Sequence, residues 1–345
     1  MDFVDLRSDT VTKPTPAMRE AMAKAEVGDD VYGEDPTVNH LQELSAELMG
    51  KEAGLFVASG TMGNLIGILA HCQRGDEVIV GKKNHVYLHE AGGISALGGV
   101  HSCQLPNQLD GSLALEDIAA AIRSDDPHEP VTRLVCLENS HHGCGGVYQT
   151  QDYIIRASEF AHTRGLSVHL DGARIFNAAV AQGIEAKKLT GPVDSVTFCL
   201  SKGLCAPVGS VLCGSNEFIH KAHRLRKMLG GGMRQAGILA AAGIVALESM
   251  IARLADDHTR ARNLADGLRQ IPGLNLYPEV PPTNMVFLLF NPAVKLDSSE
   301  VFLKLKRNGI LADVTGSRSF RLVLHYWIDN AGVEKTIEAF RNVLE

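Results

Sequence analysis

Long apolar runs are missing from this sequence of 345 residues: no stretch approaches the roughly 18 consecutive apolar residues that a membrane-spanning helix needs. The first ten residues are M-D-F-V-D-L-R-S-D-T, with acid where a signal peptide carries base and no apolar segment. An excess of positive charge is also missing, since 33 Lys and Arg face 40 Asp and Glu, a net charge of −7. We therefore expect a cytoplasmic protein that binds neither membrane nor nucleic acid.

Paired cysteines are absent as well. The seven cysteines are odd in number, form no C-x-x-C pair and mostly lie in apolar runs, as reduced structural thiols do. Histidines at 85, 89, 141 and 142 raise the question of a metal, but carboxylates at metal-binding spacing do not accompany them. We expect no metal site.

The composition is that of a globular protein, with 45% hydrophobic and 21% charged residues. A chain of this length is expected to form a large domain and a smaller one. We predict an N-terminal arm and first helix over residues 1–30, a large α/β domain over 31–250, and a small C-terminal α+β domain with a connecting helix over 251–345.

Short apolar runs alternate with helical segments through the first two hundred residues. The runs fall at 54–58, 77–81, 100–105, 133–138, 166–170 and 195–200, and the helices near 61–72, 87–97, 112–123 and 152–162. Apolar strands separated by helices predict a mostly parallel sheet covered on both faces. Further along, a long helical stretch covers 234–270, with a break expected near Asp256 and Asp257.

A lysine and an aspartate at strand ends indicate the chemistry. Asp171 ends the run L-S-V-H-L-D, and Lys202 follows the run S-V-T-F-C-L. Taken singly, Asp171 is more often a helix N-cap and Lys202 a solvated side chain. Together they suit pyridoxal phosphate, which needs an amine for its imine and an acid partner for its ring nitrogen. Arg174, close to Asp171 in sequence, has a planar fork that matches a carboxylate.

Five other segments carry candidate ligand groups. The turn S-G-T-M-G-N, with Ser59, Gly60 and Thr61, follows a strand and opens a helix, so its free N–H groups can seat a phosphate. Histidines follow two other strands and offer groups for ring stacking or acid–base chemistry: His85, His141 and His142. Arg234 after three glycines can reach an anion. Arg321 lies in an apolar strand, where burial requires a partner such as a carboxylate.

The order and spacing of these motifs resemble the low-specificity L-threonine aldolases, which are fold-type I pyridoxal phosphate enzymes. The motifs are D-L-R-S-D-T-V-T, G-D-D-V-Y-G-E-D-P, S-G-T-M-G-N, L-E-N-S-H, H-L-D-G-A-R-I-F-N-A, S-K-G-L, R-K-M-L-G-G-G-M-R-Q-A-G and R-L-V-L-H. The resemblance spans nearly the whole chain. It implies retro-aldol cleavage of L-threonine, L-allo-threonine and related β-hydroxy-α-amino acids to glycine and an aldehyde.

The resemblance also implies roles for single residues. Lys202 would hold the cofactor, Ser59, Gly60 and Thr61 its phosphate, and Asp171 its ring nitrogen, with His85 stacked on the ring. Ser8, Arg174 and Arg321 would bind the substrate carboxylate, and His85 or His141 would act as base. Arg234 and Tyr32 would serve a neighbouring subunit in a homotetramer built from catalytic dimers.

Two departures from the family pattern concern the substrate pocket. The family commonly reads E-N-T-H-N, where this chain has E-N-S-H-H, so His142 replaces an amide; it also commonly reads R-L-V-T-H, where this chain has R-L-V-L-H. Two alternatives stay open. In the first, the same residues and cofactor serve an amino acid racemase or a β-eliminating lyase. In the second, the protein is a catalytically silent oligomer that binds the cofactor.

Overall fold

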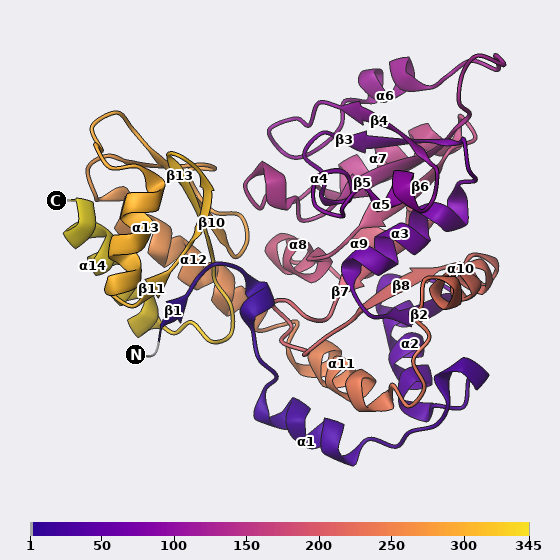
Figure 1. Cartoon of the computed structure of the whole chain (residues 1–345), viewed down its shortest axis with the longest axis horizontal. Helices are drawn as coiled ribbons and strands as arrows, with labels where there is room; N and C mark the ends of the chain where they lie inside the picture. The colour runs from indigo at the N-terminus through magenta and orange to yellow at the C-terminus, as the bar shows by residue number, and fades with distance from the viewer. Residues whose placement is uncertain (1–2, 345) are drawn as a thin grey trace.

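The computed structural model describes residues 3–344 and shows two units side by side (Figure 1). The larger unit is built on a seven-stranded sheet with the order β2-β8-β7-β6-β5-β3-β4. Its strands are Ala53–Val57 (β2), Glu77–Gly81 (β3), His101–Leu105 (β4), Thr132–Glu138 (β5), Ser167–Asp171 (β6), Ser195–Cys199 (β7) and Ser210–Gly214 (β8). Within these residues only β8 runs against its neighbours, so the predicted α/β class with a mostly parallel sheet is confirmed.

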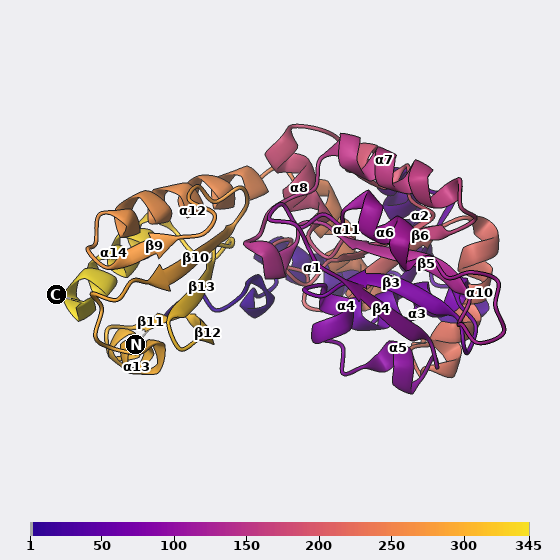
Figure 2. The ribbon, with the colours of Figure 1, turned by 90° about the horizontal axis from the view of Figure 1, so that it is seen from above.

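Helices cover both faces of this sheet (Figure 2). Successive strand residues point to opposite sides, and in the central strands the residues on both sides are apolar. On β3, Val78 and Val80 join one apolar cluster and Ile79 joins another. One face carries α3 (Gly60–His71) and α10 (Asn216–Met228); the other carries α2 (Pro36–Met49), α7 (Gln151–His162), α8 (Ile175–Gln182), α9 (Ala186–Thr190) and α11 (Gly237–Ser249). At the sheet's edge, α6 spans Leu115–Ala121. Glycines let α3 approach closely, since a Cβ on Gly67 would lie 2.6 Å from the His169 ring.

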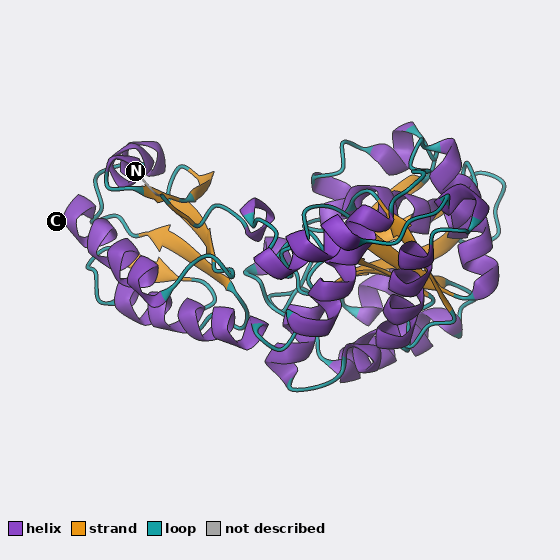
Figure 3. Cartoon of the chain, turned by 90° about the horizontal axis from the view of Figure 1, so that it is seen from below, coloured by secondary structure: helices purple, strands orange, loops and turns teal. Residues whose placement is uncertain are grey.

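The smaller unit has a core of its own, formed by an antiparallel sheet and three helices (Figure 3). The sheet has the order β12-β13-β10-β9, with Leu274–Leu276 (β9), Met285–Phe290 (β10), Asp313–Gly316 (β12) and Ser319–Val323 (β13). The helices are α12 (Leu254–Arg269), α13 (Ser298–Arg307) and α14 (Asn330–Leu344). The predicted domain limits at residues 30 and 250 stay a prediction.

The N-terminal arm connects the two units. Its strand β1 (Val4–Asp5) pairs in parallel with β11 (Ile310–Leu311) of the smaller unit. A short 3-10 turn, η1 (Asp9–Val11), follows, and then α1 (Pro16–Lys24), which packs on α11 of the larger unit. Figure 1 shows this indigo segment passing from one unit to the other. The predicted helix start at Pro16 is confirmed, with Thr15 as its N-cap.

Two helix predictions were wrong in detail. The helix expected near 87–97 is split into α4 (His85–Leu88) and α5 (Gly93–Ala96), because Ala91 and Gly92 adopt left-handed φ angles of 54° and 67°. The break expected near Asp256 and Asp257 lies earlier, between α11 and α12. Those aspartates occupy the first turn of α12, where the helix dipole favours negative charge.

None of the helices in the described residues is long and apolar enough to cross a bilayer alone. Only α11 and α12 taken together reach that length and composition, and they are bent by 70°.

Candidate active site

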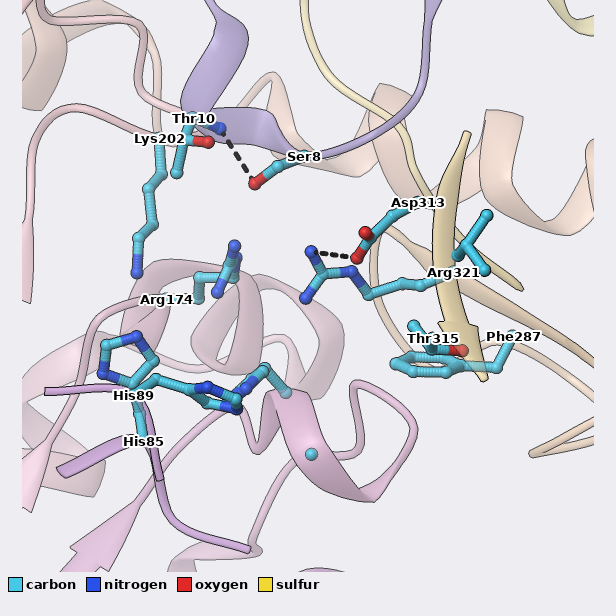
Figure 4. A pocket seen from close by; sticks show the side chains of 13 residues that line it. Ser8, Thr10, His85, His89, Arg174, Lys202, Phe287, Asp313, Thr315 and Arg321 are labelled. Carbon is cyan, nitrogen blue, oxygen red and sulfur yellow. Dashed lines mark hydrogen bonds and ion pairs between the residues drawn. The ribbon is translucent and has the colours of Figure 1, made fainter. Parts of the chain in front are cut away.

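A cavity of about 530 Å³ lies where the carboxyl edge of the large sheet, the arm and the smaller unit meet (Figure 4). Its size is in the range of about 300–1,000 Å³ that small-molecule sites occupy. The arm contributes Ser8 and Thr10, and β13 contributes Arg321. Parallel strands bring their carboxyl ends to one edge, so residues far apart in sequence gather there.

Lys202 lines this cavity, three residues beyond the end of β7. Its backbone carbonyl accepts a hydrogen bond from Thr12 of the arm at 2.9 Å. In Figure 4 its amine points toward Arg174 and the imidazoles of His85 and His89. The side chain therefore faces the pocket rather than bulk solvent.

Asp171 is buried at the end of β6, close to His85. Asn64 donates to Asp171 Oδ2 and to Glu90 Oε1, both at 2.9 Å, and His85 Nδ1 lies 2.8 Å from the same Glu90 oxygen. The helix that follows begins at Ile175 with Arg174 as its N-cap, so Asp171 is not a capping residue. Its carboxylate belongs to a network beside the cavity.

The charges in this network shift one another's protonation. Burial and the charge of Asp171 raise the pKa of Glu90. Burial alone would lower the pKa of His85, but the hydrogen bond to Glu90 and the charge of Asp171 raise it above its ordinary value. Among residues 3–344, His85, Glu90 and Asp171 are the one group with ligand atoms spaced for a metal, within 4.8 Å of one another.

The two neighbouring histidines after β5 have different surroundings. His142 lines the cavity, whereas His141 is fully buried and does not. The Nε2 atom of His141 lies 3.1 Å from both Asn84 and Asn107. Burial lowers the pKa of His141. The sequence motif alone therefore did not indicate which of the two faces the pocket.

Two arginines face each other across the cavity (Figure 4). Arg174 Nε and Nη2 bind Asp9 at 2.8 and 2.5 Å, which leaves Nη1 for a ligand. Burial alone would raise the pKa of Asp9, but the charge of Arg174 holds it well below its usual range. Arg321 Nη2 pairs with Asp313 at 2.9 Å, and its buried Nε has no hydrogen-bond partner among the described residues.

The predicted phosphate seat lies at the start of α3, outside the lining of this cavity. Ser59 caps the helix by accepting from the Met62 N–H at 3.2 Å. A Cβ on Gly60 would lie 2.8 Å from Cys199 Sγ, so the seat adjoins the strand that leads to Lys202. Ser59 and Thr61 are exposed.

Arg234 and Tyr32 also lie outside the cavity of their own chain. Arg234 Nη1 pairs with Asp29 at 2.8 Å, and its guanidinium carbon is 5.9 Å from the centre of the Tyr32 ring. The Tyr32 side chain is 75% exposed. Both residues are thus displayed on the surface and make no contact with this pocket.

Several polar residues of the site were missed by sequence reasoning. The sequence motifs contain Asp9 and Asn64 without assigning them a role, and Glu90 and Asp313 were likewise given none. Their partners lie far away in sequence: Asn64 and Asp171, for example, are 107 positions apart. The usable signal was that Asp9 and Asn64 both lie in quoted motifs, Asp9 directly after Ser8 and Asn64 at the end of S-G-T-M-G-N.

These residues fit pyridoxal phosphate. Lys202 offers an amine in the cavity, Asp171 a buried carboxylate, and the twelve-residue helix α3 an N-terminus with exposed residues for a phosphate. Arg321 lines the cavity with an Nη1 that has no hydrogen-bond partner among the described residues, and this group suits the carboxylate of an amino acid. Fold and site together define a pyridoxal phosphate enzyme of the fold-type I class.

Comparison with known proteins narrows this class. Residues 5–291 match the family described as "Beta-eliminating lyase". A "Probable low-specificity L-threonine aldolase 2" from Arabidopsis thaliana is 49% identical over 99% of this chain and 97% of that protein. A "Low specificity L-threonine aldolase" from Escherichia coli K12 is 52% identical over 83% of this chain and 84% of that protein. The chain belongs to the low-specificity L-threonine aldolase family.

Solved structures agree with this fold. Threonine aldolase from Leishmania major superposes with a TM-score of 0.83 over 99% of both chains, at 21% identity. Serine palmitoyltransferase from Sphingomonas wittichii gives 0.76 over 99% of this chain and 87% of that one, at 17% identity. The protein is a carbon–carbon lyase that uses pyridoxal phosphate, and the resemblance inferred from the sequence motifs is confirmed.

Proposed function

We propose that the protein cleaves L-threonine, L-allo-threonine and related β-hydroxy-α-amino acids to glycine and an aldehyde. The observation that carries this proposal is the cavity in which the Lys202 amine faces Arg174 and Arg321. An α-amino acid has one amine-bearing carbon and one carboxylate, and these groups match a lysine-bound cofactor and a pair of guanidinium groups. The family membership supports the same reaction.

The cofactor, when bound, supplies an electron sink for the pair left on Cα as the Cα–Cβ bond breaks. Lys202 would hold it, Ser59, Gly60 and Thr61 would bind its phosphate, and Asp171 would place negative charge beside its ring nitrogen. Asn64 fixes the carboxylate of Asp171 by a 2.9 Å hydrogen bond. His85 would pack against the ring, with its orientation set by Glu90.

The substrate carboxylate would bind Arg321 Nη1 and Arg174 Nη1, with the Ser8 hydroxyl as a third donor. Because Asp9 and Asp313 already bind these guanidinium groups, the arginines are fixed in place before a ligand arrives. Such preorganisation holds the bond to be broken in one orientation. We do not assign the proton transfer to His141, because its ring is buried away from the cavity.

We further propose a cytoplasmic homotetramer built from catalytic dimers. The support is the exposure of Tyr32 and Arg234, which make no contact with their own pocket. In such a dimer both would complete the site of the neighbouring subunit, with Arg234 at its phosphate.

Replacing Lys202 by Ala tests the proposed reaction. We expect the wild type to release acetaldehyde from L-threonine and L-allo-threonine, and Lys202→Ala to release none in the steady state and to lose the visible absorption of the lysine-bound cofactor. Lys221→Ala is the matched control, because Lys221 is exposed and, among residues 3–344, its ion pair is with Glu217 on its own helix. Racemisation of L-alanine by the wild type without aldehyde release would instead favour the racemase alternative.

A further inference from the structure

We infer that His169 is a positioning residue: through Asn64, it holds the carboxylate of Asp171 in the orientation that the cofactor's ring nitrogen requires. The inference rests on the role proposed for Asp171. Asn64 and His169 both lie in motifs that carry the family resemblance, S-G-T-M-G-N and H-L-D-G-A-R. Both are buried outside the lining of the cavity, so His169 acts on the reaction through another residue.

The side chains involved lie on one face of the large sheet. His169 and Asp171 are two residues apart in β6, so they point to the same side. Ser195 of β7 is the register partner of His169. Helix α3 covers this face with Asn64, and Gly67 of the same helix leaves room for the His169 ring, since a Cβ on Gly67 would lie 2.6 Å from it.

The side-chain amide of Asn64 has a fixed direction. Its Nδ2 donates to Asp171 Oδ2 and to Glu90 Oε1, both at 2.9 Å. An ionised carboxylate only accepts hydrogen bonds, so the nitrogen of the amide, and not its oxygen, faces Asp171. The oxygen therefore faces His169, whose Nε2 lies 3.2 Å away. Both N–H groups of Asn64 and its oxygen are thus engaged.

This contact requires one tautomer of His169. Burial lowers the pKa of His169 to about 3, with a further contribution from the charge of His71, so the ring is neutral near pH 7 and carries one proton. An Nε2–H donates to the oxygen of Asn64, and the bare Nδ1 accepts from the Ser195 hydroxyl at 2.8 Å. The opposite tautomer would set the lone pair of Nε2 against the oxygen of Asn64.

The hydrogen-bond chain begins at His71, at the end of α3. Its Nε2 lies 2.8 Å from Ser195 Oγ, and burial lowers the pKa of His71 to about 4. The Ser195 hydroxyl has a single proton, which it donates to His169, so its oxygen accepts from the Nε2–H of His71. Every bond then donates in one direction, from His71 through Ser195, His169 and Asn64 to Asp171.

The chain fixes how Asp171 presents its charge. Oδ1 of Asp171 accepts from the Ala173 N–H at 3.1 Å and Oδ2 accepts from Asn64, so two donors hold the plane of the carboxylate. If the amide of Asn64 flipped, its oxygen would face the carboxylate and repel it. The donor on His169 prevents this flip. His169 therefore affects the reaction without touching cofactor or substrate.

Two variants of similar size separate this role from simple packing. His169→Gln keeps an N–H donor for Asn64 and an acceptor for Ser195, whereas His169→Met has neither. We expect His169→Met to lower kcat for aldehyde release from L-threonine by about 10- to 100-fold, the range found for residues that orient the ligands of catalytic metals. KM should change little, because Arg174 and Arg321 are untouched. His169→Gln should keep most of the wild-type kcat.

Cofactor affinity gives a second readout, which needs no turnover. When the cofactor-free protein is titrated with pyridoxal phosphate and followed by visible absorption, His169→Met should bind more weakly than wild type and His169→Gln should not. Equal values of kcat for the two variants, or a loss confined to KM, would overturn the inference.

Asp171→Ala distinguishes the inference from the role on which it rests. If Asp171→Ala keeps wild-type aldehyde release, the proposed role of Asp171 fails. If it abolishes release while His169→Met does not lower it, the inference about His169 alone fails.

The tautomer of His169 can be measured directly in the wild type. Nitrogen-15 NMR of the cofactor-free protein labelled at histidine, with His169→Gln for assignment, is expected to show a neutral His169 ring protonated on Nε2. A ring protonated on Nδ1 would contradict the hydrogen bond to Asn64, whether or not His169→Met folds.

Discussion

Removing the carboxylate of Asp9 tests how the arm is held over the cavity. Asp9 is fully buried, binds two nitrogens of Arg174, and lies 3.4 Å from the Asn284 amide nitrogen of the smaller unit. Asp9→Ala leaves the buried Arg174 charge without a partner, and breaking such a pair from one side costs about 3–5 kcal/mol. We therefore expect a loss of this size in the free energy of unfolding.

The chain supplies both a probe and a control for this experiment. Trp327 is the single tryptophan, and its indole N–H donates to the Lys13 carbonyl of the arm at 3.0 Å. Its fluorescence in a urea titration therefore reports detachment of the arm, and far-UV circular dichroism reports unfolding of the whole protein. Asp5→Ala breaks the ion pair with Arg7 on the same arm, but Arg7 is half exposed, so we expect a loss of at most about 1 kcal/mol. Equal losses for Asp9→Ala and Asp5→Ala would refute the reasoning.

Three further outcomes follow from the site and the fold. Arg321→Met should raise KM for L-threonine by about 10- to 100-fold in a steady-state aldehyde assay, since a hydrogen bond to a charged group contributes about 1.5–3 kcal/mol. An unchanged KM would contradict the binding of the substrate carboxylate by Arg321. Gly63→Ala should lower stability by about 1–3 kcal/mol in urea, because its Cβ would lie 2.5 Å from Thr197 Cγ2, whereas Gly93→Ala, with its nearest contact at 3.7 Å, should not. Burial alone would raise the pKa of Asp9, but pairing with Arg174 depresses it. The contribution of the Asp9 carboxylate to the free energy of unfolding is therefore complete above about pH 4, the pKa of an aspartate in the unfolded chain, and shrinks below that pH. The difference in free energy of unfolding between wild type and Asp9→Asn, measured in urea at a series of pH values, should therefore narrow below about pH 4. A difference that widens there would contradict the depressed pKa of Asp9.

The sheet of the larger unit could be predicted because its strands are buried on both faces. Such a strand is a short, continuous apolar run, as in E-V-I-V-G. The bounds of this strand at Glu77–Gly81 were predicted to the residue. The segment 87–97 was harder, since its composition suits a helix while Ala91 takes a left-handed φ angle that sequence does not encode.

The site was predictable where residue type alone defines a chemical role. Lys202 and Asp171 stand at strand ends, and parallel pairing brings such ends together. The residues that orient them could not be found this way, because Asn64, Glu90 and Asp9 bind partners that only the fold brings near. The two histidines at 141 and 142 are neighbours of the same residue type, and they differ in burial and in hydrogen-bond partners, so the choice between them required coordinates.

The pairing of the arm with β11 sets when the cavity can be completed during synthesis. Val4 leaves the ribosome early, yet its partner Ile310 is made near the end of the chain. At about 5–20 residues per second, the arm waits roughly 15–60 s for that partner. Asp313 and Arg321, which line the cavity, are made later still, so a nascent chain stalled before Ile310 cannot complete its substrate-binding pocket.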